Sequence, residues 1–183
     1  MKKRALIILH PGFEEVEAVT PIDLLMRGKV DVVPASLNGE LHVEGSHHIT
    51  LKATHHFTDV VDEDFDAIIL PGGPGIKEIR RHPLLCTLLK KQHAAGKLIG
   101  CICAAPLLLH DAELTTGLHY TAHPSAEKEL PGITHEAVAK DGSIITSRGA
   151  GTATEFALAL LQYLTDEETA REVAESICWT HGL

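Results

Sequence analysis

Short runs of mostly apolar residues recur between polar segments in the first part of this chain. The four runs are residues 5–9 (ALIIL), 30–35 (VDVVPA), 67–70 (AIIL) and 97–102 (KLIGCI). Runs of this length are typical of strands that are covered on both faces in a parallel sheet. Because parallel strands need long crossover connections, these runs favour architectures in which helices alternate with strands.

Helical patterns lie between these runs. Residues 14–27 begin with acidic and end with basic side chains, and residues 83–95 run up to Gly96, which suits the end of a helix. Further elements are expected as a helix after Pro106, a strand near residues 118–122 and helices near residues 152–164 and 166–176. The order predicts an α/β fold: a flavodoxin-like, doubly wound, mostly parallel sheet with helices on both faces.

Two turn signals interrupt the alternation. Asn38-Gly39 predicts a hairpin turn that leads through LHVEG and HHITLKA and forms a small antiparallel side element. Asp141-Gly142 predicts a second hairpin-like pair. The chain has no internal repeat, low-complexity segment or linker, and its 183 residues are 44% hydrophobic. We therefore expect one domain over residues 1–183.

Charge and cysteine content narrow the classes of function. Sixteen Lys and Arg against 25 Asp and Glu give a net charge of -9, which disfavours binding to nucleic acid or to an anionic membrane. No apolar run approaches the roughly 20 residues of a membrane span, and the basic N-terminus precedes too short an apolar run for a secretory signal. The four cysteines lack CxxC spacing, so reduced thiols in a cytoplasmic protein are expected, without a zinc site or disulfides.

Two cysteines one residue apart, Cys101 and Cys103, end the run LIGCICAAP. In an open α/β sheet the ligand crevice lies beyond the carboxyl ends of the strands, so Cys103 is favoured as the reactive residue. Cys101 lies inside the run, where a cysteine usually behaves as a small buried hydrophobe. Small neighbours suit the sharp turn of a nucleophile elbow, and Pro106 suits the first turn of a helix whose amides favour a thiolate. The alternative is a core cysteine that precedes a helix.

Three further segments follow predicted strands and point to the same edge of the sheet. The glycines of PGGPG (residues 71–75) allow backbone amides to approach a ligand or form an oxyanion hole. Glu14 and Glu17 open the first predicted helix and can share a face, so a carboxylate that points into the crevice is a candidate acid or base. The alternative is that these carboxylates only compensate the helix dipole. His123 in TAHP could reach this edge, or it could be a solvated or capping histidine.

Taken in order, KRALIIL, GFEEVEAVTPIDLL, ILPGGPG, LIGCICAAPLLL, TAHP and DGSIITSRGAGTATEFALALL resemble the ThiJ/PfpI superfamily, and most closely its Parkinsonism-associated protein deglycase branch. The resemblance runs through nearly the whole chain. It implies a homodimer with a nucleophilic Cys103, an adjacent Glu17 and a nearby His123. It also implies an oxyanion or substrate pocket formed at Gly72, Gly73 and Ala104.

Some residues differ from the patterns of relatives. The protease-like branch has a histidine directly after the nucleophile, whereas this chain has Ala104, so we do not expect a peptidase. His47 stands where the deglycase branch often carries an arginine. Asp23 and Arg27 match the branch and are expected at the dimer side, although a plain helix-end charge pair is the alternative. The pairs His47-His48 and His55-His56 are not expected to bind metal, because adjacent residues of a strand point to opposite sides.

The resemblance implies an enzyme that acts on methylglyoxal-like dicarbonyls, or on their early adducts, and releases hydroxy acids without a cofactor. The candidate residues suit that chemistry, with Cys103 attacking an aldehyde, Glu17 carrying a proton and His123 assisting. Because two negative charges would repel each other, we expect a protonated Glu17 beside an anionic Cys103. The alternative function is an oxidative-stress sensor or redox-regulated chaperone that uses oxidation of Cys103.

Overall fold

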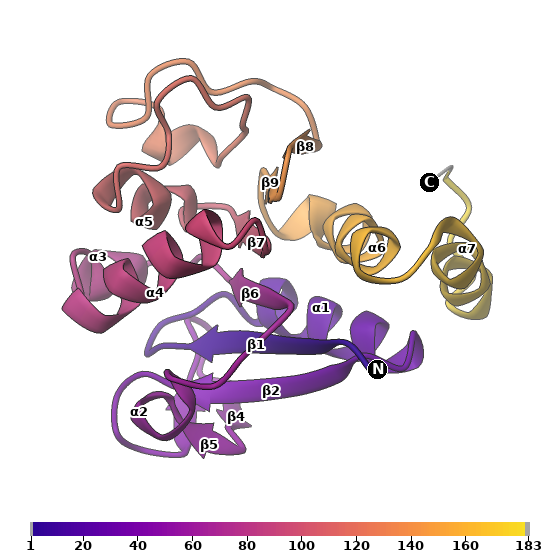
Figure 1. The fold of residues 1–183 in the computed structure, drawn as a ribbon, viewed down its shortest axis with the longest axis horizontal. Coiled ribbons are helices and arrows are strands. Elements are labelled where there is room, and N and C mark those ends of the chain that lie inside the picture. Colours follow the sequence, from indigo (N-terminus) through magenta and orange to yellow (C-terminus); the bar gives the residue numbers. More distant parts are fainter. Residues whose placement is uncertain (1, 182–183) are drawn as a thin grey trace.

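The apolar runs form the centre of one sheet in the computed structural model, which describes residues 2–181 (Figure 1). The strands of this sheet are β1 (Arg4–Leu9), β2 (Asp31–Ser36), β5 (His55–His56), β6 (Ala67–Leu70), β7 (Leu98–Ile102), β8 (Val138–Asp141) and β9 (Ile144–Ser147). Within the described residues their order is β5-β2-β1-β6-β7-β9-β8, and only the β8–β9 pair is antiparallel. The five strands β2-β1-β6-β7-β9 have the flavodoxin-like order, which confirms the predicted fold class.

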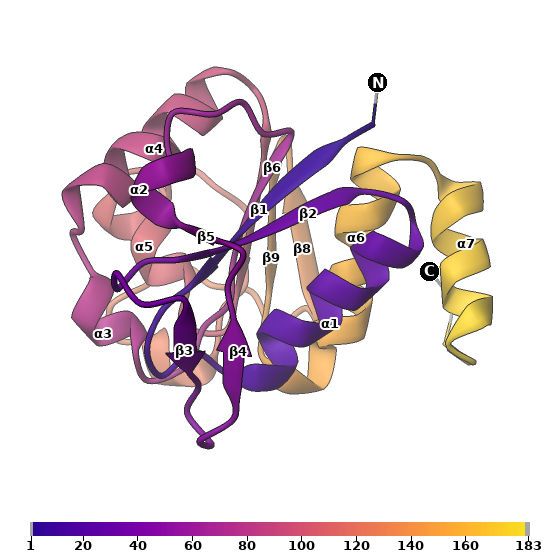
Figure 2. The same ribbon diagram turned by 90° about the horizontal axis from the view of Figure 1, so that it is seen from below.

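Helices cover both faces of the sheet, as Figure 2 shows. One face carries α1 (Glu15–Arg27), α6 (Ala153–Leu164) and α7 (Glu167–Ser176). The opposite face carries α2 (Phe57–Val60), α3 (Ile76–Ile79), α4 (Pro83–Ala94) and α5 (Pro106–Asp111). None of the helices in the described part of the chain is long and apolar enough to cross a membrane.

Alternating side chains of each central strand enter two separate cores. Ile7 and Leu9 of β1 pack with α1 and α6, whereas Ile8 packs with the helices of the opposite face. Burying a side chain of this size contributes about 1.5–3 kcal/mol relative to leaving it exposed. The same alternation directs Cys101 of β7 into the α2–α5 core, where it is completely buried.

The small antiparallel side element is present, but its turn differs from the predicted one. β3 (His42–Glu44) pairs with β4 (Thr50–Lys52), and the turn between them spans residues 45–49 instead of Asn38-Gly39. The reason lies in the position of β2, which is paired with β1 on one side and β5 on the other. Since both edges of β2 are occupied, the chain after Asn38-Gly39 leaves the sheet and forms its hairpin elsewhere.

The prediction of a strand near residues 118–122 is wrong. The segment makes only an isolated parallel bridge, from Thr121 to Thr134. Its hydrogen bonds go to side chains and loops: Thr121 N–H donates to Thr146 Oγ1 at 2.9 Å, and Thr121 Oγ1 donates to the Thr134 carbonyl at 2.9 Å. The place beside β7 is taken by β9, which pairs with β8 across the predicted Asp141-Gly142 turn.

Candidate active site

A cavity of about 610 Å³ opens at the carboxyl ends of the central strands. Its lining includes Glu14, Gly73, Cys103, Ala104 and His123. Glu14, Gly73 and the pair Cys103-Ala104 follow β1, β6 and β7, whereas His123 comes from the loop after α5. The strand order reverses direction between β1 and β6, which is where ligands bind in doubly wound folds. A second cavity, of about 300 Å³ beside β8 and α6, contains none of the predicted site residues.

Cys103 occupies the sharp turn between β7 and α5. Its backbone φ is 65°, a left-handed conformation that costs a residue other than glycine about 1–3 kcal/mol. Two backbone hydrogen bonds fix this turn: Cys103 N–H donates to the Ser147 carbonyl, and the Cys103 carbonyl accepts from His123 N–H, each at 2.9 Å. The thiol is half-buried, whereas Cys101 is fully buried. This geometry favours Cys103 as the reactive cysteine.

Glu17 points from the first turn of α1 into the same region and is only 1% exposed. Its Oε2 accepts the Gly72 N–H at 2.9 Å, and its carboxyl group lies beside the Cys103 thiol. Burial raises the pKa of Glu17 to about 7. Glu14 is the N-cap of α1, where its carboxylate accepts the Glu17 N–H at 2.8 Å. Glu14 therefore caps the helix, and Glu17 is the carboxyl group that lies in the crevice.

The amides expected for the oxyanion pocket have two different partners. Gly73 and Ala104 direct their N–H groups at the Cys103 thiol, whereas the Gly72 N–H is bonded to Glu17. Gly72 is nevertheless required, since a Cβ atom at this position would lie 2.7 Å from the Cβ of Cys103. The loop thus brings its backbone against both candidate catalytic groups.

The sequence analysis expects a thiolate at Cys103, whereas the surroundings of this residue favour the protonated thiol. Burial, and then the charge of Glu17, raise the pKa of Cys103 to about 12, against the opposing effect of the Gly73 and Ala104 amides. The short helix α5 behind the turn does not offset this burial. The protein therefore places a thiol next to a carboxyl group whose pKa is near neutrality.

His123 lies in the same cavity, and Ser125 orients its ring. The His123 Nδ1 accepts the Ser125 N–H at 3.1 Å and lies 2.8 Å from Ser125 Oγ, so the proton of the neutral ring is on Nε2. Gly149 lies between His123 and Glu17, because a Cβ there would be 3.5 Å from the imidazole and 3.8 Å from Glu17 Oε1. The Ala150 amide also contacts the Glu17 carboxyl group. The sequence analysis missed Ser125, Gly149 and Ala150, although SRGAG (residues 147–151) after the last apolar strand was a signal for the last two.

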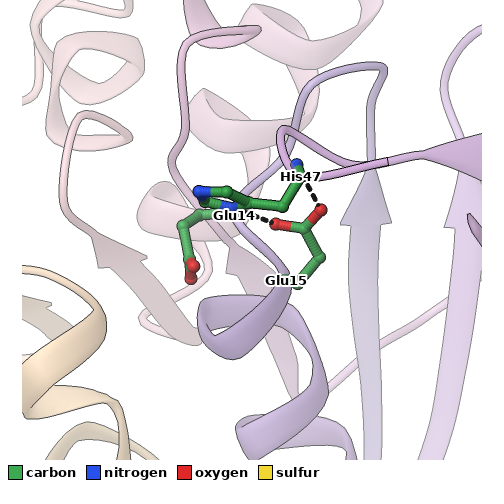
Figure 3. A group of neighbouring side chains, drawn as sticks. All are labelled: Glu14, Glu15 and His47. Carbon is green, nitrogen blue, oxygen red and sulfur yellow. Dashed lines mark hydrogen bonds and ion pairs between the residues drawn. The ribbon is translucent and has the colours of Figure 1, made fainter. Parts of the chain in front are cut away.

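His47 forms an ion pair with Glu15 at the rim of the cavity (Figure 3). Glu15 Oε1 accepts the His47 N–H at 2.6 Å, and Oε2 lies 2.8 Å from His47 Nδ1 and accepts from Ser46 Oγ at 3.1 Å. Although burial opposes it, these bonds lower the pKa of Glu15 to about 2, and the bond to Glu15 raises the pKa of His47. The pair ties the β3–β4 turn to the start of α1.

Glu14, Glu15 and His47 also have ligand atoms within 4.8 Å of one another and are the described residues that could hold a metal ion. His47 and His48 lie in a turn, not on a strand, and pair with different acids, because His48 Nδ1 contacts Glu44 Oε1 at 2.7 Å. The carboxylate oxygens of Glu15 are already engaged by Ser46 and His47. These bonds use the Glu15 carboxylate to join the β3–β4 turn to the start of α1.

Comparisons with known proteins agree with the fold and show the family of this chain. The model of the DJ-1/PfpI family matches residues 3–163. The chain is 37% identical to protein dj-1beta of Drosophila melanogaster and 36% identical to glutathione-independent glyoxalase DJR-1.2 of Caenorhabditis elegans, each over 97% of both chains. The crystal structure of Drosophila DJ-1beta superposes with a TM-score of 0.95 and 36% identity, covering 99% of this chain and 100% of that one. Oxidized Toxoplasma gondii DJ-1 gives a TM-score of 0.94 at 33% identity, over 98% and 100%.

Proposed function

Because this chain belongs to the DJ-1/PfpI family, we propose that it is a cofactor-independent glyoxalase or deglycase with Cys103 as its nucleophile. Its substrates are methylglyoxal-like dicarbonyls or their early adducts, and its products are hydroxy acids. The observation that carries the proposal is the strained Cys103 turn, with Glu17 on one side and the Gly73 and Ala104 amides at the sulfur. A relative named as a glutathione-independent glyoxalase supports the reaction class.

In the proposed reaction, the thiol group of Cys103 adds to the aldehyde carbon. The thiol proton passes to an ionised Glu17, and the oxygen of the resulting thiohemiacetal receives the Gly73 and Ala104 N–H groups. Glu17 passes this proton to the thiohemiacetal oxygen and is ionised again. It then takes the proton from the former aldehyde carbon and delivers it to the neighbouring carbonyl carbon, while the hydroxyl proton moves to the oxygen of that neighbouring carbon, which leaves a hydroxy thioester. Water hydrolyses this thioester, releasing the hydroxy acid and the thiol, so no external oxidant or reductant is consumed.

Glu17 is suited to carry the moving proton because its pKa of about 7 lies near neutral pH. His123 assists through Nε2–H, which is left to donate because Nδ1 is engaged by Ser125. Proteolysis is not proposed, since Ala104 replaces the histidine that would act as the base of a Cys-His pair. A reduced Cys103 fits the expected cytoplasmic location.

A homodimer is proposed on the outer face of α1. Val16, Val19 and Met26 of this helix are 48%, 44% and 59% exposed, which is unusual for three large apolar side chains of one helix. The ion pair between Asp23 and Arg27, at 2.9 Å, lies on the same helix. A partner subunit would cover this apolar surface.

Oxidation sensing is the second candidate, favoured by the half-buried and strained Cys103 thiol. The two functions are separated by measuring lactate formation from methylglyoxal without oxygen, using the purified chain and its Cys103→Ser and Cys86→Ser variants. The glyoxalase proposal expects lactate from the wild type and from Cys86→Ser, and none from Cys103→Ser. Equal lactate formation by Cys103→Ser would overturn the cysteine mechanism, and an inactive wild type would favour the sensor.

A further inference from the structure

His10, at the end of β1, is a fully buried imidazole that neither the sequence analysis nor the proposed reaction uses. Its Nδ1 lies 3.1 Å from the Pro11 carbonyl oxygen, and its Nε2 lies 3.3 Å from the Pro71 carbonyl oxygen. The ring therefore bridges the loop after β1 and the loop after β6. Gly75 makes room for it, since a Cβ at position 75 would lie 2.8 Å from His10 Nδ1.

The peptide group between Pro71 and Gly72 connects His10 to the candidate active site. Its carbonyl faces His10 Nε2, and its N–H donates to Glu17 Oε2 at 2.9 Å. Because a trans peptide is planar, with C=O and N–H pointing in opposite directions, fixing the carbonyl also fixes the direction of the N–H. A donor to the carbonyl also polarises the peptide and strengthens the N–H as a donor.

The next peptide group is anchored in a similar way. The Gly72 carbonyl accepts the Glu14 N–H at 3.1 Å, and the Gly73 N–H faces the Cys103 thiol. The two consecutive peptides thus hold Glu17 and Cys103 on one side, while His10 and the start of α1 hold their carbonyls. Of the two contacts to these carbonyls, the one from His10 is made by a side chain and the one from Glu14 by a backbone N–H.

We propose that His10 is a positioning residue, whose Nε2–H donates to the Pro71 carbonyl and thereby aims and polarises the Gly72 N–H toward Glu17. The proposal deepens the proposed function and rests on it for the role of Glu17 as proton carrier. Burial lowers the pKa of His10, so the ring is neutral and has one N–H. Only one of its two carbonyl contacts is then a hydrogen bond at any moment, and the proposal assigns that bond to Pro71.

Two amide variants separate the contacts. Glutamine places its Nε2 near the position of the imidazole Nε2, so His10→Gln keeps a donor for Pro71. Asparagine places its Nδ2 near the imidazole Nδ1, so His10→Asn keeps a donor only for Pro11. His10→Leu removes both donors at similar volume, and His93→Leu, at an exposed position on α4, is the control.

The experiment measures kcat, KM, the thermal midpoint and the pH dependence of Cys103 alkylation for each variant. We expect His10→Leu and His10→Asn to lose about fivefold to tenfold in kcat with little change in KM, the scale of one hydrogen bond. The rate of Cys103 alkylation should change with pH as Glu17 ionises. In these two variants the midpoint of that change should move to higher pH by about half a unit, because the ionised carboxylate loses stabilisation. His10→Gln and His93→Leu should resemble the wild type in both measurements.

Equal behaviour of His10→Asn and His10→Gln would overturn the proposal, as would unchanged kcat and alkylation in His10→Leu. If His10→Leu fails to fold, the comparison of the two amide variants decides, since both retain a polar side chain. The alkylation profile needs no turnover, so it tests His10 even if the wild type produces no lactate. An inactive wild type with the expected alkylation shifts would count against the proposed function and in favour of the positioning role.

Discussion

The carboxyl group of Glu17 lies beside the thiol of Cys103, although Glu17 is in the first turn of α1 and Cys103 follows β7. Glu17 is buried and Cys103 is half-buried, and burial raises the pKa of each. Because two negative charges would repel each other there, the pair keeps at least one proton at neutral pH. The carboxyl group, with its pKa of about 7, is the member of the pair that changes its charge near neutral pH.

Replacing Glu17 by glutamine should keep a polar group at the site but remove the proton carrier. We expect Glu17→Gln to lose about 10²-fold or more in dicarbonyl turnover, the usual scale of general acid-base catalysis. Alkylation of Cys103 should remain at least as fast, because the charge that raises the thiol pKa is gone. Steady-state kinetics and timed alkylation check this, with the exposed Glu44→Gln as control. Wild-type turnover in Glu17→Gln would transfer the proton step to another group, with His123 the next candidate.

The raised pKa of Glu17 also predicts how stability depends on pH. Between its ordinary value of 4.5 and about 7, the folded protein retains a proton that the unfolded chain releases. Stability therefore falls as pH rises through this window, by about 3 kcal/mol in total for Glu17 alone. Urea unfolding of the wild type and Glu17→Gln at about pH 5 and pH 8 measures the effect as a difference between the two proteins.

Other groups do not obscure this comparison. Glu15, with its pKa lowered to about 2, contributes its full stabilisation above its ordinary value of 4.5 and loses it only in more acidic solution. The pKa of His47 is raised, so the stabilisation that His47 contributes is lost at higher pH, but this loss is common to the wild type and Glu17→Gln. A pH slope that is equal in the wild type and Glu17→Gln would contradict the prediction.

Selective modification should distinguish the four cysteines. We expect brief treatment with iodoacetamide or peroxide to modify Cys103, which lines the cavity, while Cys101 stays unmodified because it is 0% exposed. Cys86 lies on α4, outside this cavity, and should react slowly. Cys178 is exposed near the C-terminus and would compete, so the measurement belongs in a Cys178→Ser background. Peptide mass spectrometry that finds Cys101 modified first would refute this assignment.

The contact between Gly45 and Glu15 should be sensitive to a single methyl group. A Cβ at position 45 would lie 2.5 Å from Glu15 Oε1. Gly45→Ala should therefore push the β3–β4 turn away from α1 and destabilise the protein by about 1–3 kcal/mol, the usual cost of overpacking. Gly151→Ala is the matched control, because nothing lies within 4 Å of its Cβ position. Equal unfolding midpoints for the two variants would show that the turn yields without cost.

The exposed apolar face of α1 predicts the effect of a charge placed on it. Val19→Asp should convert the proposed homodimer into monomers, since a desolvated carboxylate in an apolar interface has no partner. Leu84→Asp changes a side chain of similar exposure, 45% against 44%, on α4 across the sheet, and should leave the assembly unchanged. Sedimentation at micromolar concentration checks both variants. A wild type that sediments only as a monomer would remove the basis for the proposed dimer.

The central strands could be predicted from the sequence because burial on both faces leaves a local mark. Residues 5–9 and 67–70 are apolar throughout, since each alternate side chain enters a different core. The different burial of Cys101 and Cys103 has a similar local basis, because Cys101 lies inside such a run and Cys103 directly after it. Where burial and turn chemistry are set by neighbours in the chain, the sequence was sufficient.

Tertiary structure decided the features that depend on which segments meet. The hairpin turn does not form at Asn38-Gly39, because β5, which comes after this turn in the chain, pairs with the remaining edge of β2. The division of roles between Glu14 and Glu17, the engagement of the Gly72 amide and the bridge made by His10 arise in the same way. A local pattern shows that a residue can be buried or can react. The groups that surround it, and so its pKa and its hydrogen bonds, are set only when the strands and helices pack.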